Sequence, residues 1–222
     1  MIKFFQKLKA KKGFTLVELI VVIAIIGVLA AILFPTMLNY VTNSRVTSAN
    51  STAASIKNNI DTFLTNADTA GYGMKRGNAN KVVLTITVTN GEWTVESGTQ
   101  DVFKDGGAYA WGGSGTGTTG AEKSGADSAE ALLAIELADL FPEVETAAIG
   151  AQLVGGKTMA VYYTAETSEY TGLDGMFNAD ENGGWATPTY AWDNTTAGVD
   201  EEGFIVGTAP LLPIGSGEST GA

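Results

Sequence analysis

The chain of 222 residues contains no cysteine and no histidine. Without cysteine it can form no disulfide, no thiolate nucleophile and no cysteine-based zinc site. Without histidine it lacks the side chain that most often acts as a general base near neutral pH or binds a metal ion. These two absences weigh against an enzyme, and we expect no catalytic residue, no cofactor and no metal site.

Positive charge is also scarce, because 13 lysines and arginines stand against 24 acids, for a net charge of −11. Five of the 13 basic residues lie among the first 12 positions, which hold no acid: Lys3, Lys7, Lys9, Lys11 and Lys12. The remaining chain therefore carries −16, since −16 and +5 give the total of −11. This negative charge disfavours nucleic acid as a partner of the chain, because phosphate binding needs clustered lysine and arginine.

One long apolar run follows the lysines. Residues 14–34 (FTLVELIVVIAIIGVLAAILF) contain a single charge, that of Glu18. About 20 apolar residues in a helix cross a bilayer, and a basic flank marks its cytoplasmic side. A cleaved secretory signal has a shorter apolar region and a small-residue cleavage site, neither of which is present here. A buried helix of a soluble protein would leave the lysines unexplained, so we predict a membrane-inserted helix.

Glu18 is the unexpected residue in this run. A carboxylate at the centre of a bilayer costs about 2.5–3.5 kcal/mol on insertion scales. Glu18 lies near the start of the run, where the cost is lower and where the positive end of the helix dipole favours an acid. It is either a tolerated interfacial acid or a functional residue, and acids inside membranes are functional by default.

The segment Lys11-Lys12-Gly13-Phe14-Thr15-Leu16-Val17-Glu18 resembles the class III signal of type IV prepilins. That signal consists of a short basic leader, a glycine, a phenylalanine and an acid at the fifth position after the cut. The resemblance covers residues 7–35. It implies that a prepilin peptidase cleaves between Gly13 and Phe14 and methylates the new amine of Phe14.

The same resemblance implies two assembly residues. Glu18 of one subunit would pair with the amine of Phe14 on a neighbouring subunit. A pair within one chain is also conceivable, because the two groups lie about one helical turn apart. Pro35 falls at position 22 of the mature chain, where many such pilins have a helix-breaking proline, and we expect it to kink or locally melt the helix.

Beyond Pro35 the pattern predicts an α+β head, in which a long helix packs on an antiparallel sheet. Apolar residues recur every three to four positions as far as Asn66, which is typical of an amphipathic helix. Asn90-Gly91 between alternating runs predicts a first hairpin, and Gly155-Gly156 predicts a second. A second helix is expected over residues 128–140, capped by Asp127 with Glu130 completing a capping box.

The predicted organisation is a cleaved leader (1–13), a transmembrane and assembly helix (14–35), an amphipathic helix (36–66), a head (67–214) and a flexible tail (215–222). Within the head, residues 106–125 are rich in glycine, threonine and serine and are predicted to form a long exposed loop. Pilins often close the C-terminal region with a disulfide, which this chain cannot do. In this respect it is more similar to pilins of Gram-positive bacteria.

Two further features have alternative interpretations. Trp111, Trp185 and Trp192 either stack on a ligand such as a sugar ring or bury their area in the core, and the second interpretation is favoured. Residues 178–183 are similar to a calcium loop, but the first ligand position is asparagine and the twelfth is Thr189 instead of glutamate. A polar turn explains that segment better.

Three functions follow from the resemblance. The first is the structural subunit of a type IV pilus, which begins in the cytoplasmic membrane and ends in a surface filament for adhesion or motility. Its partners would be other copies of itself, prepilin peptidase, the assembly machinery, the membrane and a surface or polysaccharide ligand. The second is a pseudopilin of a type II secretion or competence system. The third is a membrane-anchored extracellular protein that binds polysaccharide without forming filaments.

Overall fold

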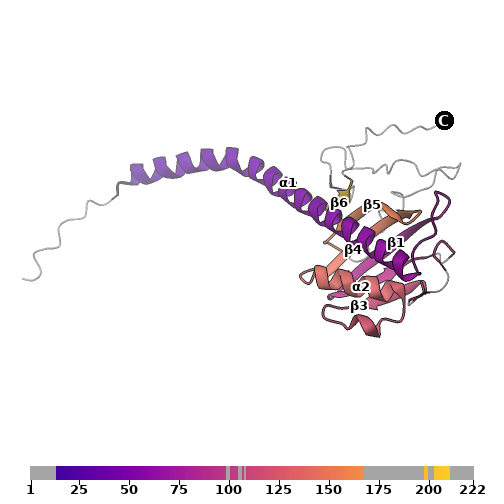
Figure 1. Ribbon diagram of the computed structural model, residues 1–222. Coiled ribbons are helices and arrows are strands. Elements are labelled where there is room, and N and C mark those ends of the chain that lie inside the picture. The colour runs from indigo at the N-terminus through magenta and orange to yellow at the C-terminus, as the bar shows by residue number, and fades with distance from the viewer. Residues whose placement is uncertain are drawn as a thin grey trace, which may run out of the picture. The chain divides into compact units, whose positions relative to one another are not determined.

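The computed structural model describes residues 14–98, 101–104, 107, 109–167, 198–199 and 203–210. The chain divides into two compact units, Met1–Asn43 and Ser44–Ala222. The helix α1 (Leu16–Ala70) contributes residues to both units. Figure 1 traces this helix and the strands of the second unit. The predicted leader (1–13) and tail (215–222) lie outside the described residues.

In the first unit, α1 is helical without interruption, including at Pro35. Of the two effects expected at Pro35, local melting is therefore wrong, and the kink stays a prediction. Proline removes only one backbone hydrogen bond, and the residues on both sides keep theirs. Next to it, the hydroxyl of Thr36 donates to the carbonyl oxygen of Leu33 at 2.9 Å.

In the second unit, α1 is amphipathic as predicted. Its buried positions recur at helical spacing: Val46, Ala49, Ala53, Ile56, Ile60, Phe63, Leu64 and Ala67. The helix continues to Ala70, four residues past the predicted end near Asn66. Ala67 is fully buried, so its packing favours a further turn. Gly71, with φ of 94°, then ends the helix, and the amide of Tyr72 donates to the carbonyl of Ala67 at 3.0 Å.

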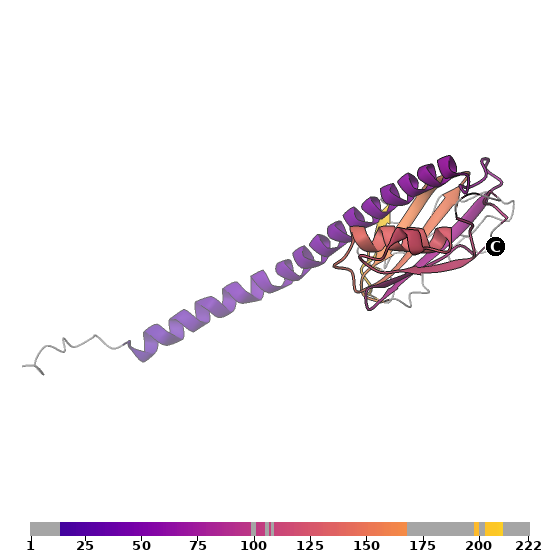
Figure 2. The same cartoon turned by 60° about the horizontal axis from the view of Figure 1, so that its bottom comes forward.

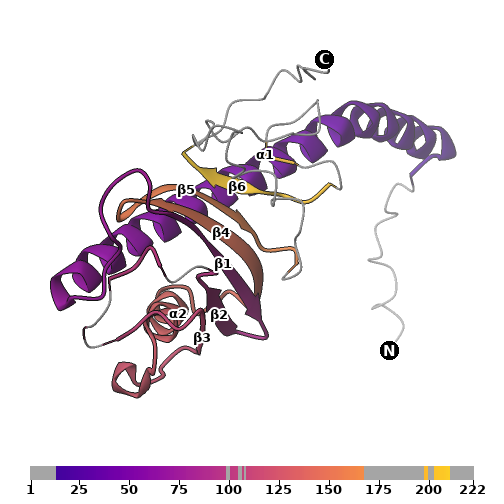
Figure 3. The ribbon, with the colours of Figure 1, turned by 90° about the vertical axis from the view of Figure 1, so that its right-hand side faces the viewer.

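A six-stranded antiparallel sheet forms the other layer, with strand order β3-β2-β1-β4-β5-β6 (Figure 3). The predicted hairpin turn Asn90-Gly91, with φ of 52° and 77°, joins the first two strands. Gly155-Gly156 joins β4 to β5, so both predicted hairpins are confirmed. The strands are β1 (Lys81–Thr89), β2 (Glu92–Glu96), β3 (Ser114–Gly117), β4 (Thr146–Val154), β5 (Lys157–Thr164) and β6 (Gly207–Ala209).

The second helix α2 (Ala129–Leu140) and the second half of α1 cover the same face of the sheet (Figure 2). One hydrophobic core joins both helices to that face, which confirms the predicted α+β architecture. The cap of α2 is Ser128, whose hydroxyl accepts from the amide of Ala131 at 3.1 Å. The predicted cap, Asp127, is wrong by one residue.

The predicted long loop over residues 106–125 is also wrong, because it contains β3 and a short 3₁₀ helix, η1 (Lys123–Gly125). The glycines of β3 let α2 approach the backbone of this edge strand. A Cβ atom on Gly115 would lie 2.2 Å from the amide nitrogen of Ala131, and one on Gly117 would lie 2.4 Å from that of Ile135. The glycine-rich composition therefore reflects close packing and not a flexible loop.

Candidate functional site

The described part of the first unit exposes a continuous apolar surface. Between Phe14 and Val41 the exposed fractions of the large apolar side chains run from 43% to 78%. The most apolar 18-residue window of α1 has a mean hydropathy of 3.1, and none of it is buried. Soluble monomers rarely expose contiguous apolar patches of more than a few hundred Å². This segment therefore needs lipid, or other apolar helices, as its surroundings.

Glu18 lies in the first turn of this helix and forms a capping box with Thr15. The amide and the hydroxyl of Thr15 both donate to Oε2 of Glu18, at 2.9 and 2.7 Å. The amide of Glu18 donates back to the hydroxyl oxygen of Thr15 at 3.2 Å. Two bonds thus hold the carboxylate, and the third holds the Thr15 side chain, at the positive end of the helix dipole.

Thr15 is a site residue that the sequence interpretation missed. The signal was present as Thr15-Leu16-Val17-Glu18, a threonine followed three residues later by glutamate directly before an apolar run. Within the described part of the chain, both contacts to the carboxylate use Oε2 of Glu18. Within those residues, Oε1 of Glu18 accepts no hydrogen bond.

The other predicted site residues are placed as follows. Phe14 is exposed, directly before the capping box, and Pro35 is an exposed position inside α1. Gly13, Trp185, Trp192 and residues 178–183 lie outside the described residues. In the described part of the chain, no group of three acidic, histidine or cysteine side chains could hold a metal ion.

Trp111 lies in the core of the second unit and is 5% exposed. Its ring stacks on Phe103 with centroids 3.8 Å apart, and its indole nitrogen donates to the carbonyl of Tyr72 at 2.7 Å. Both the ring face and the polar edge are therefore used within the molecule. The ligand-stacking alternative does not hold for Trp111.

Glu130 is a buried acid whose role the sequence interpretation also missed. Its carboxylate accepts from the hydroxyl of Ser97 at 2.7 Å and from the amides of Gly113 and Gly112 at 2.7 and 2.9 Å. Its side chain is fully buried, and no cation is among these three donors. Glu130 thus fastens α2 to the segment between β2 and β3, which is a structural role.

Comparison with known proteins finds a family model described as a prokaryotic N-terminal methylation motif, which matches residues 8–34. The chain is 39% identical to fimbrial protein Q of Moraxella bovis over 106 residues, which are 47% of this chain and 66% of that protein. It is 36% identical to fimbrial protein EcpC of Eikenella corrodens over 105 residues, 43% of this chain and 69% of that protein.

A shorter match is to the type IV major fimbrial protein FimA of Dichelobacter nodosus, at 43% identity over 61 residues, 28% of this chain and 39% of that protein. For most of these relatives the matched part is less than two thirds of their length, as with the 66% of fimbrial protein Q and the 39% of FimA. No solved structure matches the chain.

Proposed function

We propose that this chain, which belongs to the type IV pilin family, is a structural subunit of a surface filament. A prepilin peptidase removes residues 1–13 and methylates the amine of Phe14. The mature chain is held in the membrane by the first part of α1 until it is added to the filament. Its role is structural and not catalytic. The observation that carries the proposal is an exposed apolar helix that begins with a capped carboxylate at Glu18.

The apolar surface explains why the subunit has two stable environments. Burial of apolar surface is worth about 25 cal/mol per Å² removed from water. Lipid removes that surface from water before assembly, and the same helices of neighbouring subunits remove it afterwards. Since both environments are apolar, transfer from membrane to filament does not expose the segment to water.

Apolar packing is non-directional, so it does not fix the position of a subunit along the filament, and Glu18 provides that position. Cleavage after Gly13 creates an amine on Phe14, and Oε1 of Glu18 accepts no other bond in the described part of the chain. A carboxylate buried without a partner is strongly destabilising, whereas a paired one is tolerated. A subunit therefore fits the growing filament only where its Glu18 meets the amine of a neighbour, which sets the axial register.

The test is mass spectrometry of the mature N-terminus in cells that express the full chain with a prepilin peptidase. We expect the mature protein to begin at methylated Phe14 and to be found in sheared surface filaments. Gly13→Val should leave an uncut precursor in the membrane and no filaments. A wild-type mature chain that retains Lys12 would overturn the proposed function.

A further inference from the structure

The basic residues of the head gather at one end of the sheet. Eight lysines and arginines follow residue 13, and six of them lie where the end of α1, the start of β1 and the β4–β5 turn meet. Backbone hydrogen bonds join these segments. The amide of Lys75 donates to the carbonyl of Val102 at 2.8 Å, and the amide of Gly155 donates to the carbonyl of Asn80 at 2.9 Å. We name this group the cationic end: Lys57, Lys75, Arg76, Lys81, Lys104 and Lys157.

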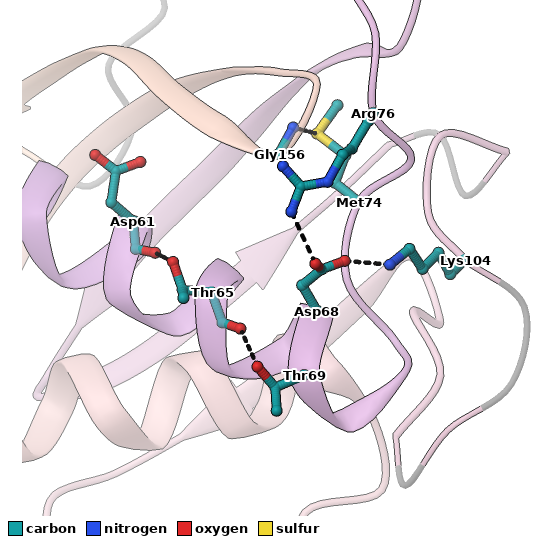
Figure 4. A network of polar contacts seen from close by, with 8 residues as sticks. All are labelled: Asp61, Thr65, Asp68, Thr69, Met74, Arg76, Lys104 and Gly156. Atoms are coloured by element: carbon teal, nitrogen blue, oxygen red, sulfur yellow. Dashed lines mark hydrogen bonds and ion pairs between the residues drawn. The ribbon is translucent and has the colours of Figure 1, made fainter.

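Two described carboxylates form ion pairs with three of these six cations. Asp68 binds both Arg76, at 3.1 Å, and Lys104 (Figure 4). Asp61 pairs with Lys57 at 3.1 Å, and the carbonyl oxygen of Asp101 accepts from Lys75. Lys157 is exposed and forms no ion pair within the described residues. Counted over the described residues, the cationic end holds six basic residues against Asp61, Asp68 and Asp101, in a chain whose net charge is −11.

A groove of about 630 Å³ runs through the cationic end, between α1 and the β4–β5 turn. Leu64, Met74 and Met159 give it an apolar part, and Met159 is 52% exposed. Thr158 also lines the groove, and its buried hydroxyl has no hydrogen-bond partner in the described part of the chain. The groove therefore combines exposed positive charge with an uncovered apolar side chain.

The opposite end of the same sheet carries exposed acids, which we name the anionic end: Glu92, Asp139, Glu143 and Glu145. The amide of Gly91 donates to the carbonyl of Glu145 at 3.1 Å, which joins the β1–β2 turn to the start of β4. Leu140, 52% exposed, lies next to Asp139 in the chain. Because Thr89 pairs with Thr146 while Lys81 pairs with Val154, the two ends are roughly 27 Å apart, at about 3.4 Å per residue.

We propose that the cationic end of one head docks on the anionic end of a neighbouring copy. The inference rests on the proposed function, because an open helical polymer needs two different surfaces that complement each other. Opposite charges favour this pairing, and like charges exclude contact between two identical ends. Met159 of one copy and Leu140 of the other would cover each other within the ring of charges.

Cysteine cross-linking tests the contact, because the chain has no cysteine of its own. The test variant carries Lys157→Cys and Glu145→Cys, and its filaments are treated with a short bismaleimide. We expect a ladder of covalent oligomers. The matched control carries Lys157→Cys and Thr85→Cys, because Thr85 is an exposed residue in the middle of β1, four residues from each end of that strand. The control should remain monomeric.

A charge exchange provides the second measurement. Lys157→Glu should lower the yield of filaments roughly tenfold at low salt, and adding Glu145→Lys should restore it, since the exchanged charges attract again. Filaments that form normally but give no ladder would overturn the docking proposal and leave the proposed function intact. A wild-type chain that forms no filaments would overturn both. Filaments that retard DNA through Lys157 without a ladder would favour a polyanion partner instead.

Discussion

The two parts of α1 differ both in apolar content, which is much higher before Asn43, and in their surroundings. Before Asn43 the apolar side chains point in all directions and all of them are exposed. After Ser44 they form one stripe, and that stripe is buried by the sheet. The comparison shows that the second part completes its packing within one molecule, whereas the first part depends on molecules outside the chain. Changes in the two parts should therefore be detected by different measurements.

The largest effect should come from Glu18→Ala, which we expect to abolish filaments while the chain stays in the membrane. The alanine leaves the neighbouring amine without its partner, and the apolar anchor is unchanged. Electron microscopy of sheared cells and immunoblots of membrane fractions measure the two quantities. Glu122→Ala, which removes an exposed acid of the head, is the control and should form normal filaments. Normal filaments from the Glu18 variant would contradict the pairing role.

Thr15→Ala separates the capping box from the pairing. It should cost about 1 kcal/mol of helix stability, which is typical of a lost N-cap, but keep the charge of Glu18. We expect filaments to form in reduced amount, and Thr15→Ser, which retains the hydroxyl, to restore them. Complete loss of filaments in the alanine variant would mean that the cap, and not the charge alone, is required.

Leu137→Ala should lower the free energy of unfolding of the head by about 3 kcal/mol, since it opens a cavity at a fully buried position. Ile26→Ala, in the exposed part of α1, should leave that quantity unchanged. Both are measured by urea unfolding of the full chain in detergent, followed by the fluorescence of the buried tryptophans. Equal decreases in the free energy of unfolding would contradict the conclusion that only the second part of α1 packs within the head.

Glu130→Ala should cost about 2 kcal/mol, because three buried donors lose their acceptor inside the head. The same unfolding experiment detects it, and filament formation by the folded fraction should persist. Glu136→Ala, which removes a half-buried acid from the same helix, is the matched control. A variant as stable as the wild type would show that the buried carboxylate is not needed to hold β3.

The smallest expected effect is a change in the stability of the head at low pH. Lys104 and Arg76 hold the pKa of Asp68 below its usual value. A carboxyl group whose pKa is lower in the folded state stabilises the fold above its unfolded pKa and loses that contribution as the pH falls through the folded value. Asp68→Asn should therefore differ from the wild type in urea midpoint at pH 7 and converge with it as the pH falls through the lowered pKa of Asp68. A difference that is independent of pH would argue against these ion pairs.

Much of the fold could be predicted from local signals. Asn90-Gly91 and the alternating residues around it specify a hairpin without help from the rest of the chain. The apolar spacing in α1 likewise specifies the face that packs. At the site, the apolar run and the position of Glu18 were sufficient to predict the segment that would need other molecules.

The missed features depend on tertiary contacts. The glycines of β3 have little strand preference, and they form a strand because α2 needs their empty space. Glu130 is a typical surface residue of a helix, and only the position of Gly112 and Gly113 opposite it makes its burial possible. Ser128 and Asp127 are both good caps, so sequence alone could not choose between them.

The contact of α2 with Gly115 and Gly117 also limits how this head can change during evolution. Any larger residue at either position would lift the helix away from the edge strand and admit water to the core beneath it. Insertions and polar substitutions are tolerated at most places where a sequence has the composition of a loop. Here, two residues without side chains should prove as intolerant of replacement as the largest buried aromatic.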